Sequence, residues 1–381
     1  MMTITDLHNK AMDIADVADI KRNEGCKDEA VSLYKEAFDL EAQAANLAHQ
    51  NNIGEPSVSI LLRSAASLAL SCNLYRESEK LISLALSGEP PFEIAEELRD
   101  LMENVNFFRH LELKGIELAE NEVQLVIAGK GIGFGYAKAE EVIDRIETFQ
   151  NLAIRTVERK AGRSFRKNGP VATEHKKFCN YYISSVRAAS MAFSIRFGAP
   201  GQMTLPGFNN YESIIDDITD NIALINENNI DKLKERIEDP AYLNNFMALT
   251  KELAPDGDTV NLFGITSIKN GKPIKTTLTS NRGEIANTIR NVSSNENVDS
   301  ITDISHSEDM NFRIEGILKA ASAKTNSVDI IQESGDSIRL KVPDGLSDIV
   351  KKYWDDNVVI EYMKKTPKSK TLHLINIEGK E

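Results

Sequence analysis

Alanine and other small apolar residues recur at helical spacing through the first 111 residues, and this pattern limits the possible folds more than any other. Apolar positions three or four residues apart run from Ala11 to Leu47 and again from Leu62 to Ala85. Such spacing places them on one face of a helix. Gly25 in the first run and Cys72-Asn73 in the second mark turns. The sequence therefore predicts an N-terminal array of paired helices.

Small residues occupy corresponding positions in the two runs. Ala18 and Ala66 would allow close approach of the first helix of each pair. Ala37 and Ala85 would do the same for the second helix, and Tyr34 and Ile82 would fill the space between pairs. This pattern resembles the tetratricopeptide repeat (TPR), which implies a curved array with a concave binding surface.

The match to that repeat is partial. Ala30 and Ser78, the expected starts of the second helices, lie 48 positions apart, whereas the usual period is about 34 residues. The proline expected after the second helix is absent after Leu40. Pro90-Pro91 precedes a third helical run, Phe92 to Leu111, which we expect to cap the array. An ordinary helical bundle is the alternative.

Composition narrows the classes of function. The 381 residues suffice for two or three domains with sizeable cores. A formal net charge of −13 argues against a protein that coats nucleic acid over its whole surface. The three cysteines are odd in number and far apart, so we expect no disulfide framework. The chain shows neither a secretory leader nor the ~20 apolar residues of a membrane span, so we expect a cytoplasmic protein without a membrane partner.

Residues 112–254 are predicted to form an α+β domain. Glu122 to Ala128 and Met191 to Phe197 have the composition and alternation of strands. Glu140 to Arg163 has helical periodicity. Three further helices are expected at Tyr211–Asn228, Ile230–Ile237 and Pro240–Leu253.

Residues 255–381 are predicted to form a β-rich domain that ends in a small barrel. Asn270-Gly271 between two apolar runs is a strong hairpin signal, because both residues tolerate positive φ. Further on, three strands, a helix over Leu346 to Trp354 and two strands follow in the order of an OB-fold. The whole chain is thus expected to be a multidomain α+β protein with domains 1–111, 112–254 and 255–381.

Glycines alternate along residues 129–135, in the segment AGKGIGFGYA. A phosphate-binding turn would need the spacing G-x-G-x-x-G between a strand and a helix, and that spacing is absent. Alternation places all four glycines on one face of a strand, where a second backbone or a ring could approach closely. A structural hairpin is favoured, with close approach of a ligand and a nucleotide loop as alternatives.

A basic segment stands out against the acidic background. Residues 155–177 contain eight Lys and Arg and two Glu, a net charge of +6. Arg155, Arg159 and Arg163 are four residues apart and would form one stripe on a helix, suited to phosphates or an acidic partner. The alternative is a solvated face paired with acids of the same protein. The candidate anion- or nucleic-acid-binding residues are Arg155, Arg159, Lys160, Arg163, Arg166, Lys167, Arg187 and Arg196.

No pattern predicts a catalytic, cofactor-binding or metal-binding residue. His175 and Cys179 are four residues apart and could pair on a helix as base and nucleophile, but no third partner is identifiable. An acidic helix face could hold Mg²⁺, although a solvated face is the favoured interpretation; its residues are Glu212, Asp216, Asp217 and Asp220.

The C-terminal barrel carries aromatic residues that a nucleic acid could stack on, namely Phe312, Tyr353, Trp354 and Tyr362. Residues 308–381 nevertheless contain 12 Lys and Arg against 13 Asp and Glu. Trp354, on an amphipathic helix, is expected to be a core residue. A structural or protein-binding barrel is therefore favoured over a nucleic-acid-binding one.

Three stretches are similar to an uncharacterised bacterial family that we associate with mobile, conflict or defence gene clusters. They lie at Arg63–Cys72, Glu93–Leu113 and Lys341–Trp354. The resemblance implies an adaptor that binds a protein encoded nearby, in an antiphage or toxin–antitoxin system. One alternative is a nucleic-acid sensor that uses the basic segment and the barrel. Another is an enzyme whose site is assembled from dispersed residues.

Overall fold

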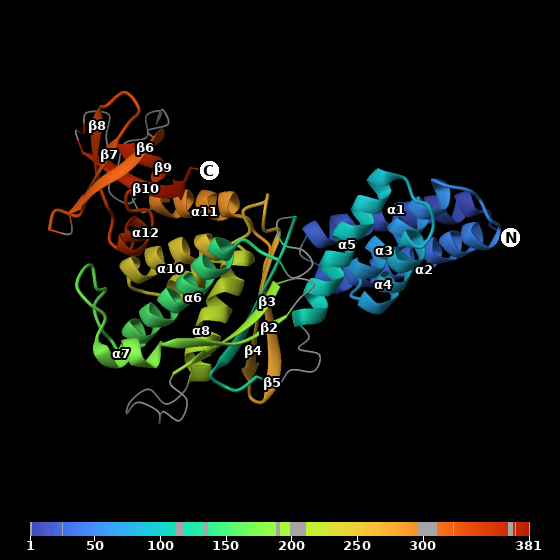
Figure 1. The fold of residues 1–381 in the computed structure, drawn as a ribbon, viewed down its shortest axis with the longest axis horizontal. Coiled ribbons are helices and arrows are strands. Elements are labelled where there is room, and N and C mark those ends of the chain that lie inside the picture. The colour runs from blue at the N-terminus through green and yellow to red at the C-terminus, as the bar shows by residue number, and fades with distance from the viewer. Residues whose placement is uncertain are drawn as a thin grey trace. The chain divides into compact units, whose positions relative to one another are not determined.

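A computed structural model describes residues 2–24, 26–111, 118–130, 132, 136–187, 191–198, 211–295, 311–322, 324–364, 369 and 371–380 (Figure 1). The chain forms two compact units. The N-terminal helices make up the first, here called the helical unit, and most residues from 116 onward make up the second, the mixed unit.

The described residues of the helical unit form five helices, each packed against its neighbour in the chain. They are α1 (Ile4–Asn23), α2 (Lys27–Gln50), α3 (Ser57–Ser71), α4 (Tyr75–Leu86) and α5 (Phe92–Leu111). A capping box starts α1, in which the Thr3 hydroxyl and the Asp6 carboxylate each accept a backbone N–H of the other residue. The expected third helical run, Phe92 to Leu111, coincides with α5.

The small residues singled out in the sequence lie inside the helix contacts. Ala18, Ala37 and Ala66 are completely buried, and Ala85 is 2% exposed. Ser78 is also buried, and its hydroxyl donates to the Ala66 carbonyl at 2.8 Å, which ties α4 to α3. Helices approach closely where side chains are this small, so the expected tight packing is confirmed at these positions.

A five-stranded sheet forms one layer of the mixed unit, in the order β2-β3-β1-β4-β5. The strands are β1 (Glu122–Ala128), β2 (Tyr181–Arg187), β3 (Met191–Phe197), β4 (Leu262–Lys269) and β5 (Lys272–Leu278). The predicted hairpin joins β4 to β5, with φ of 51° at Asn270 and 71° at Gly271. The sequence-based boundary after residue 254 therefore falls between strands of a single sheet.

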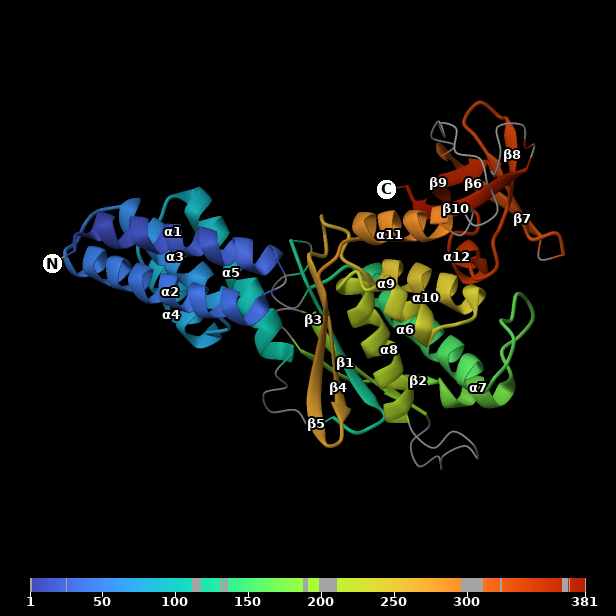
Figure 2. The same cartoon turned by 180° about the vertical axis from the view of Figure 1, so that it is seen from behind.

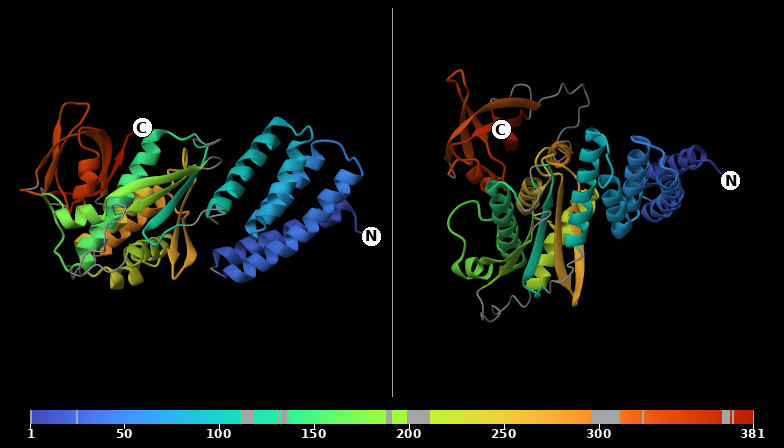
Figure 3. Two further views of the ribbon diagram at one scale, coloured as in Figure 1. Left: turned by 60° about the horizontal axis from the view of Figure 1, so that its bottom comes forward. Right: turned by 45° about the vertical axis from the view of Figure 1, so that its right-hand side comes forward.

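Helices lie on one side of this sheet (Figures 1 and 3). They are α6 (Ala139–Lys160), α7 (Thr173–Phe178), α8 (Tyr211–Asn226), α9 (Ile230–Arg236) and α10 (Pro240–Leu253). Helix α11 (Arg282–Asn295) packs farther out, on α10. Helix α8 packs on β4 and β5, and α6 packs on both α8 and α10. The expected helices at 140–163, 211–228, 230–237 and 240–253 are thus present with small shifts of their ends.

Helix α11 was not predicted from the sequence, and its C-terminal end is a polar stretch. The helix continues through Asn295. Its start is fixed by a reciprocal cap, in which Asn281 Oδ1 accepts the Glu284 N–H and Glu284 Oε2 accepts the Asn281 N–H, both at 2.9 Å. Buried Ile285 and Val292 hold the helix down, so tertiary packing outweighs the low helix propensity of the polar end.

A closed five-stranded barrel follows, in the order β10-β8-β7-β6-β9 (Figure 2). Its elements are β6 (Asn311–Ser322), β7 (Ser327–Ile331), β8 (Ser337–Lys341), α12 (Ser347–Lys352), β9 (Asn357–Lys364) and β10 (Leu372–Gly379). The predicted order of three strands, a helix and two strands is confirmed. Strands β8 and β10 run parallel, and the other paired strands run antiparallel.

The expectation that Trp354 is a core residue is wrong, because half of its surface is exposed. Helix α12 ends at Lys352, so Trp354 lies in the turn before β9 rather than on the helix. The apolar contacts of α12 are made instead by Ile349 and Val350, which are buried.

Candidate binding sites

Helix α6 positions the predicted basic residues. Its apolar side, which includes Ile146, Phe149 and Leu152, is buried. Arg155 follows one turn before the C-terminal end, and Arg159 and Lys160 lie in the last turn, where cations interact favourably with the helix dipole. Whether these side chains can bind an external anion depends on what already contacts them.

Arg155 is only 4% exposed and binds groups of its own chain. Its guanidinium donates to both carboxylate oxygens of Asp348 on α12, with Nε to Oδ2 at 2.8 Å and Nη2 to Oδ1 at 2.9 Å. Nη1 donates to Glu158 Oε2 at 2.9 Å and to the Arg166 carbonyl at 3.0 Å. The guanidinium carbon lies 4.3 Å from the centre of the Phe165 ring. These contacts engage all three nitrogens, so Arg155 acts as an internal link between α6 and α12.

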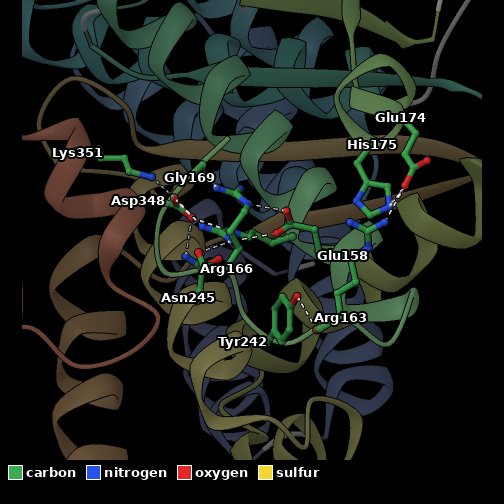
Figure 4. Close-up of polar contacts among 11 residues, drawn as sticks. Glu158, Arg163, Arg166, Gly169, Glu174, His175, Tyr242, Asn245, Asp348 and Lys351 are labelled. Atoms are coloured by element: carbon green, nitrogen blue, oxygen red, sulfur yellow. Dashed lines mark hydrogen bonds and ion pairs between the residues drawn. The ribbon is translucent and has the colours of Figure 1, made fainter. Parts of the chain in front are cut away.

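Asp348 is held as a carboxylate within this cluster. Burial opposes its ionisation, but the hydrogen bonds and charge of Arg155 outweigh burial and lower the pKa of Asp348. Asn245 donates to Asp348 Oδ2 at 3.0 Å, and Lys351 lies 3.6 Å from Oδ1. Figure 4 shows Asn245 and Lys351 converging on this carboxylate.

Glu158 binds a second arginine of the predicted set. Its Oε1 accepts from Arg166 Nε at 2.7 Å, and Arg166 Nη1 donates to the Gly169 carbonyl at 2.9 Å (Figure 4). Glu158 is 3% exposed, so this pair is shielded on the carboxylate side. The segment after α6 is thereby folded back on the helix.

The remaining candidates whose side chains are described also contact groups of the same chain. Arg159 pairs with Asp217, and Lys160 donates to the hydroxyl and carbonyl of Ser213. Further ion pairs join Arg163 to Glu174 at 2.7 Å, Lys167 to Asp344 at 2.7 Å, and Arg196 to Glu122 at 3.3 Å. Arg187 lies in β2, and its side chain is outside the described residues.

The predicted arginine stripe is therefore not an open row of cations. Its members are divided among carboxylates of the same chain, which is the alternative that the sequence left open. Arg163, with about half of its side chain exposed, is the most accessible of the three. Lys176 and Lys177 on α7 are exposed lysines of the same segment.

The possible nucleophile, Cys179, lies in surroundings that disfavour ionisation of its thiol. Burial raises the pKa of the Cys179 thiol to about 12, so the reactive thiolate is not populated near neutral pH. His175 is buried, and burial lowers the pKa of its imidazole. The acidic face of α8 is paired with basic residues, since Lys269 lies 3.4 Å from Asp216 and Arg236 lies 3.4 Å from Asp220. Among the described residues, no three His, Cys, Asp or Glu side chains are placed to hold a metal ion.

Most of the glycine-rich segment, Gly131 and Gly133–Gly135, lies outside the described residues. Gly129 forms an isolated antiparallel bridge with Ile132 just after β1. This bridge agrees with a turn at the start of the segment.

A buried polar cluster that no sequence pattern predicted lies between α10 and the barrel. Lys251 is 2% exposed and donates to Asn376 Oδ1 at 2.7 Å and to the Ile377 carbonyl at 2.8 Å. The adjacent Glu252 accepts from Lys352 Nζ at 2.8 Å and from the Tyr353 hydroxyl at 2.7 Å. The Lys251-Glu252 pair near the C-terminal end of α10 was the available signal, but the same two residues are equally typical of an exposed helix end.

A groove of about 380 Å³ crosses the helical unit and is lined by α1, α3 and α5, which alternate with α2 and α4 along the chain. Met12 and Leu101 supply apolar surface. Arg63 and Glu97 form an ion pair at 2.5 Å within the groove, and Asp100 adds an exposed carboxylate. The groove thus offers apolar and acidic contacts side by side.

Comparison with protein-family models, curated protein sequences and solved structures gives no match. In the part of the chain that the structure describes, no helix has the length and hydrophobicity that crossing a membrane requires. Any function must therefore be argued from the geometry of these sites.

Proposed function

We propose that the groove of the helical unit binds a segment of a protein partner, and that the protein is a non-enzymatic adaptor in a bacterial antiphage or toxin–antitoxin system. The observation that carries the proposal is the groove across α1, α3 and α5. Helical arrays commonly recognise proteins through the surface formed by alternate helices.

The packing of the helices supports a TPR-like arrangement. The small residues that this repeat requires, including Ala18 and Ala66 in the first helices and Ala85 in a second helix, are buried in helix contacts. Helices α1, α3 and α5 then correspond to the first helix of successive pairs, the helices that line a concave surface. Small side chains make the array tight enough for this surface to be preformed.

The lining of the groove indicates the chemistry of the partner segment. Met12 and Leu101 would contact apolar side chains. Glu97 already pairs with Arg63, so Asp100 is the carboxylate that would attract Lys or Arg. The net charge of −13 on the whole chain favours approach of a basic partner. We therefore propose a partner segment that combines apolar and basic residues.

Co-purification of the tagged chain from its native host tests the proposal. Ser67 is exposed in the groove, so Ser67→Trp should block it and lower recovery of the partner about tenfold or more. Ser83 is exposed on α4 outside the groove, so Ser83→Trp is the matched control and should leave recovery of the partner unchanged.

Two results would contradict the proposed adaptor function. Equal recovery with both variants would exclude the groove as the binding surface. A chain that elutes alone while hydrolysing a nucleotide, a nucleic acid or a peptide with turnover would favour the enzyme alternative.

A second candidate function is nucleic-acid binding by the barrel. Strand order and the parallel β8–β10 pair support an OB-like barrel. Phe312 is 41% exposed, stacks on Tyr362 with ring centres 5.3 Å apart, and has Lys364 Nζ 5.4 Å from its centre. Exposed rings beside a cation are the contacts that unpaired bases use.

Binding of single-stranded DNA and RNA at low salt tests this candidate. Affinity should fall steeply with salt, and Phe312→Ala should weaken binding by about 1–3 kcal/mol. Ile331→Ala, at an exposed position on β7, is the control. Lys176→Glu with Lys177→Glu tests the basic segment without disturbing buried Arg155. No binding at low salt would exclude this function.

A further inference from the structure

An apolar cavity of the mixed unit lies where the segment after α6 meets the barrel. This cavity has a volume of about 650 Å³, within the range of about 300–1,000 Å³ typical of small-molecule sites. Its walls come from Phe165 to Gly169, from the β6–β7 turn, from Val342 to Gly345 and from α12. The cavity lies wholly in the mixed unit, so it is independent of the groove proposed above.

One wall of the cavity is fixed by the arginine cluster. Arg155 donates to the Arg166 carbonyl at 3.0 Å, and Arg166 donates to the Gly169 carbonyl at 2.9 Å. Phe165 lies beneath the Arg155 guanidinium and packs edge-to-face on Tyr242, with ring centres 5.2 Å apart. The buried guanidinium of Arg155 therefore holds in place the segment after α6, which faces the cavity.

The opposite wall is also held by specific hydrogen bonds. The Gly345 carbonyl accepts from Asn245 Nδ2 at 2.8 Å, and the Val342 N–H donates to the Asn326 carbonyl at 2.8 Å. Gly345 has φ of 104°, and a Cβ there would lie 2.5 Å from the Ala241 carbonyl oxygen, so only glycine fits. Two fixed walls make this a preformed site, which lowers the entropic cost of binding.

The lining combines a flat aromatic ring with basic groups. Trp354, half exposed, lines the cavity together with Val328 and Val350. Lys167 pairs with Asp344 at 2.7 Å, so these two charges offset each other. Lys351 Nζ lies 3.6 Å from Asp348 Oδ1, but that carboxylate already accepts two hydrogen bonds from Arg155, and the Lys351 side chain is exposed. An indole face favours stacking of a flat ring, and exposed Lys351 favours an anion.

A buried polar atom adds to this lining. The Ser347 hydroxyl is shielded from solvent and has no hydrogen-bond partner among the described residues, and Ser347 lines the cavity. Buried hydroxyl groups are normally hydrogen-bonded, because an unmet bond costs free energy. A polar group of a bound molecule would supply the missing partner.

We propose that this cavity binds a small molecule that joins a flat aromatic ring to an anionic group, the chemistry of a nucleoside monophosphate. The ring stacks on Trp354 between Phe165 and Val350, and the anion lies toward Lys351. Such a ligand would bridge the segment after α6 and the barrel, and it would stabilise their contact.

Fluorescence of the full chain tests the proposal directly, because Trp354 is the single tryptophan of the protein. Titration with AMP, GMP, CMP and UMP should change its emission saturably with at least one of them, and calorimetry should give the same affinity. The matching nucleoside, which lacks phosphate, should bind more weakly. Lys351→Ala should remove that difference.

A matched pair of variants locates the ligand. Ala321 is exposed and lines the cavity, whereas its neighbour Ala320 is exposed on β6 outside it. Ala321→Phe should fill the cavity and weaken binding about tenfold or more, and Ala320→Phe should not change it. Circular dichroism of both variants verifies that they fold.

Three outcomes would overturn the proposal. The first is the absence of saturable binding by all four monophosphates at millimolar concentration. The second is equal binding by folded Ala321→Phe and Ala320→Phe variants. The third is much tighter binding of a single-stranded oligonucleotide than of any monophosphate, which would assign the surface to nucleic acid instead.

Discussion

The interior of the helical unit and the interior of the mixed unit are stabilised by different kinds of contact. In the helical unit the closest contacts are made by completely buried alanines, such as Ala37, Ala44 and Ala65. In the mixed unit the helices meet the barrel through buried charges, chiefly Arg155 with Asp348 and Lys251 beside Glu252. The first kind of contact depends on shape and the second on completed charge pairs.

This difference implies different sensitivities. A tight apolar contact is disturbed by added volume and is indifferent to pH. A buried ion pair tolerates neither the loss of one partner nor its protonation, because the remaining charge is left without water or a partner. Trp354 reports unfolding of the mixed unit, whereas far-ultraviolet circular dichroism reports the helices of both units.

The largest effect is expected from breaking the Arg155–Asp348 pair. Asp348→Ala leaves a buried guanidinium with fewer partners and should destabilise the mixed unit by about 3–5 kcal/mol in urea unfolding followed by Trp354 fluorescence. Replacing both residues, Arg155→Met with Asp348→Leu, should cost less than Asp348→Ala alone. A loss below about 1 kcal/mol for Asp348→Ala would show that water reaches the pair.

The next effect is the response to acid. Burial opposes ionisation of Glu252, but Lys251, Lys352 and Arg282 outweigh burial and lower its pKa to about 2. A depressed carboxylate pKa stabilises the fold above the unfolded value of 4.5 and loses that contribution as pH falls toward 2. The mixed unit should therefore lose about 3 kcal/mol between about pH 5 and pH 2 through this group.

Glu103 in the helical unit should make stability change with pH in the opposite direction. Burial and the nearby Asp100 raise its pKa to about 7, so its contribution is complete below pH 4.5 and is lost as pH rises through 7. Mild acidification should thus raise the melting temperature of the helical unit, and Glu103→Gln should remove that dependence. If the melting temperatures of both units rose between pH 7 and pH 3, the expected difference between the two units would be wrong.

A smaller effect is expected from overfilling the helix contacts. Ala37→Leu and Ala85→Leu should each destabilise the helical unit by about 1–3 kcal/mol, because the added methylene groups have no space. Ser32→Leu, at an exposed position on α2, is the control and should change stability by less than about 0.5 kcal/mol. If both alanine variants melted at the same temperature as the unmodified protein, these alanines would have to face solvent.

The smallest effect is expected at the edge of the basic segment. Arg163 and Glu174 form an ion pair with about half of each side chain exposed. Arg163→Ala should cost about 0.2–1 kcal/mol, and the loss should shrink at high salt, since surface pairs are screened. A loss comparable to that of Asp348→Ala would place Arg163 in the buried cluster.

Local patterns predicted the elements well where neighbouring residues decide the backbone. The hairpin at Asn270-Gly271, helix α10 from Pro240 to Leu253 and strand β1 from Glu122 to Ala128 lie where the sequence places them. Helix α11 and the exposure of Trp354 were not predicted from the sequence. Both depend on what a distant segment buries, which periodicity does not report.

The candidate sites were harder to predict for the same reason. The arginine spacing on α6 is visible in the sequence, but the partner of Arg155 is Asp348, which lies 193 residues away. Likewise Lys251 meets Asn376 across 125 residues. Only closure of the barrel against α10 and α6 brings these groups together.

The sequence by itself determined the helical runs of the helical unit, the order of strands and helix in the barrel, the small residues in the helix contacts and the acidic charge of the chain. These properties follow from local spacing and composition. The tertiary structure alone decided that the basic segment is paired internally, that Trp354 lines a cavity, and that α1, α3 and α5 share a groove. Charge pairing and cavity shape depend on distances between segments far apart in the chain, and a linear pattern does not contain those distances.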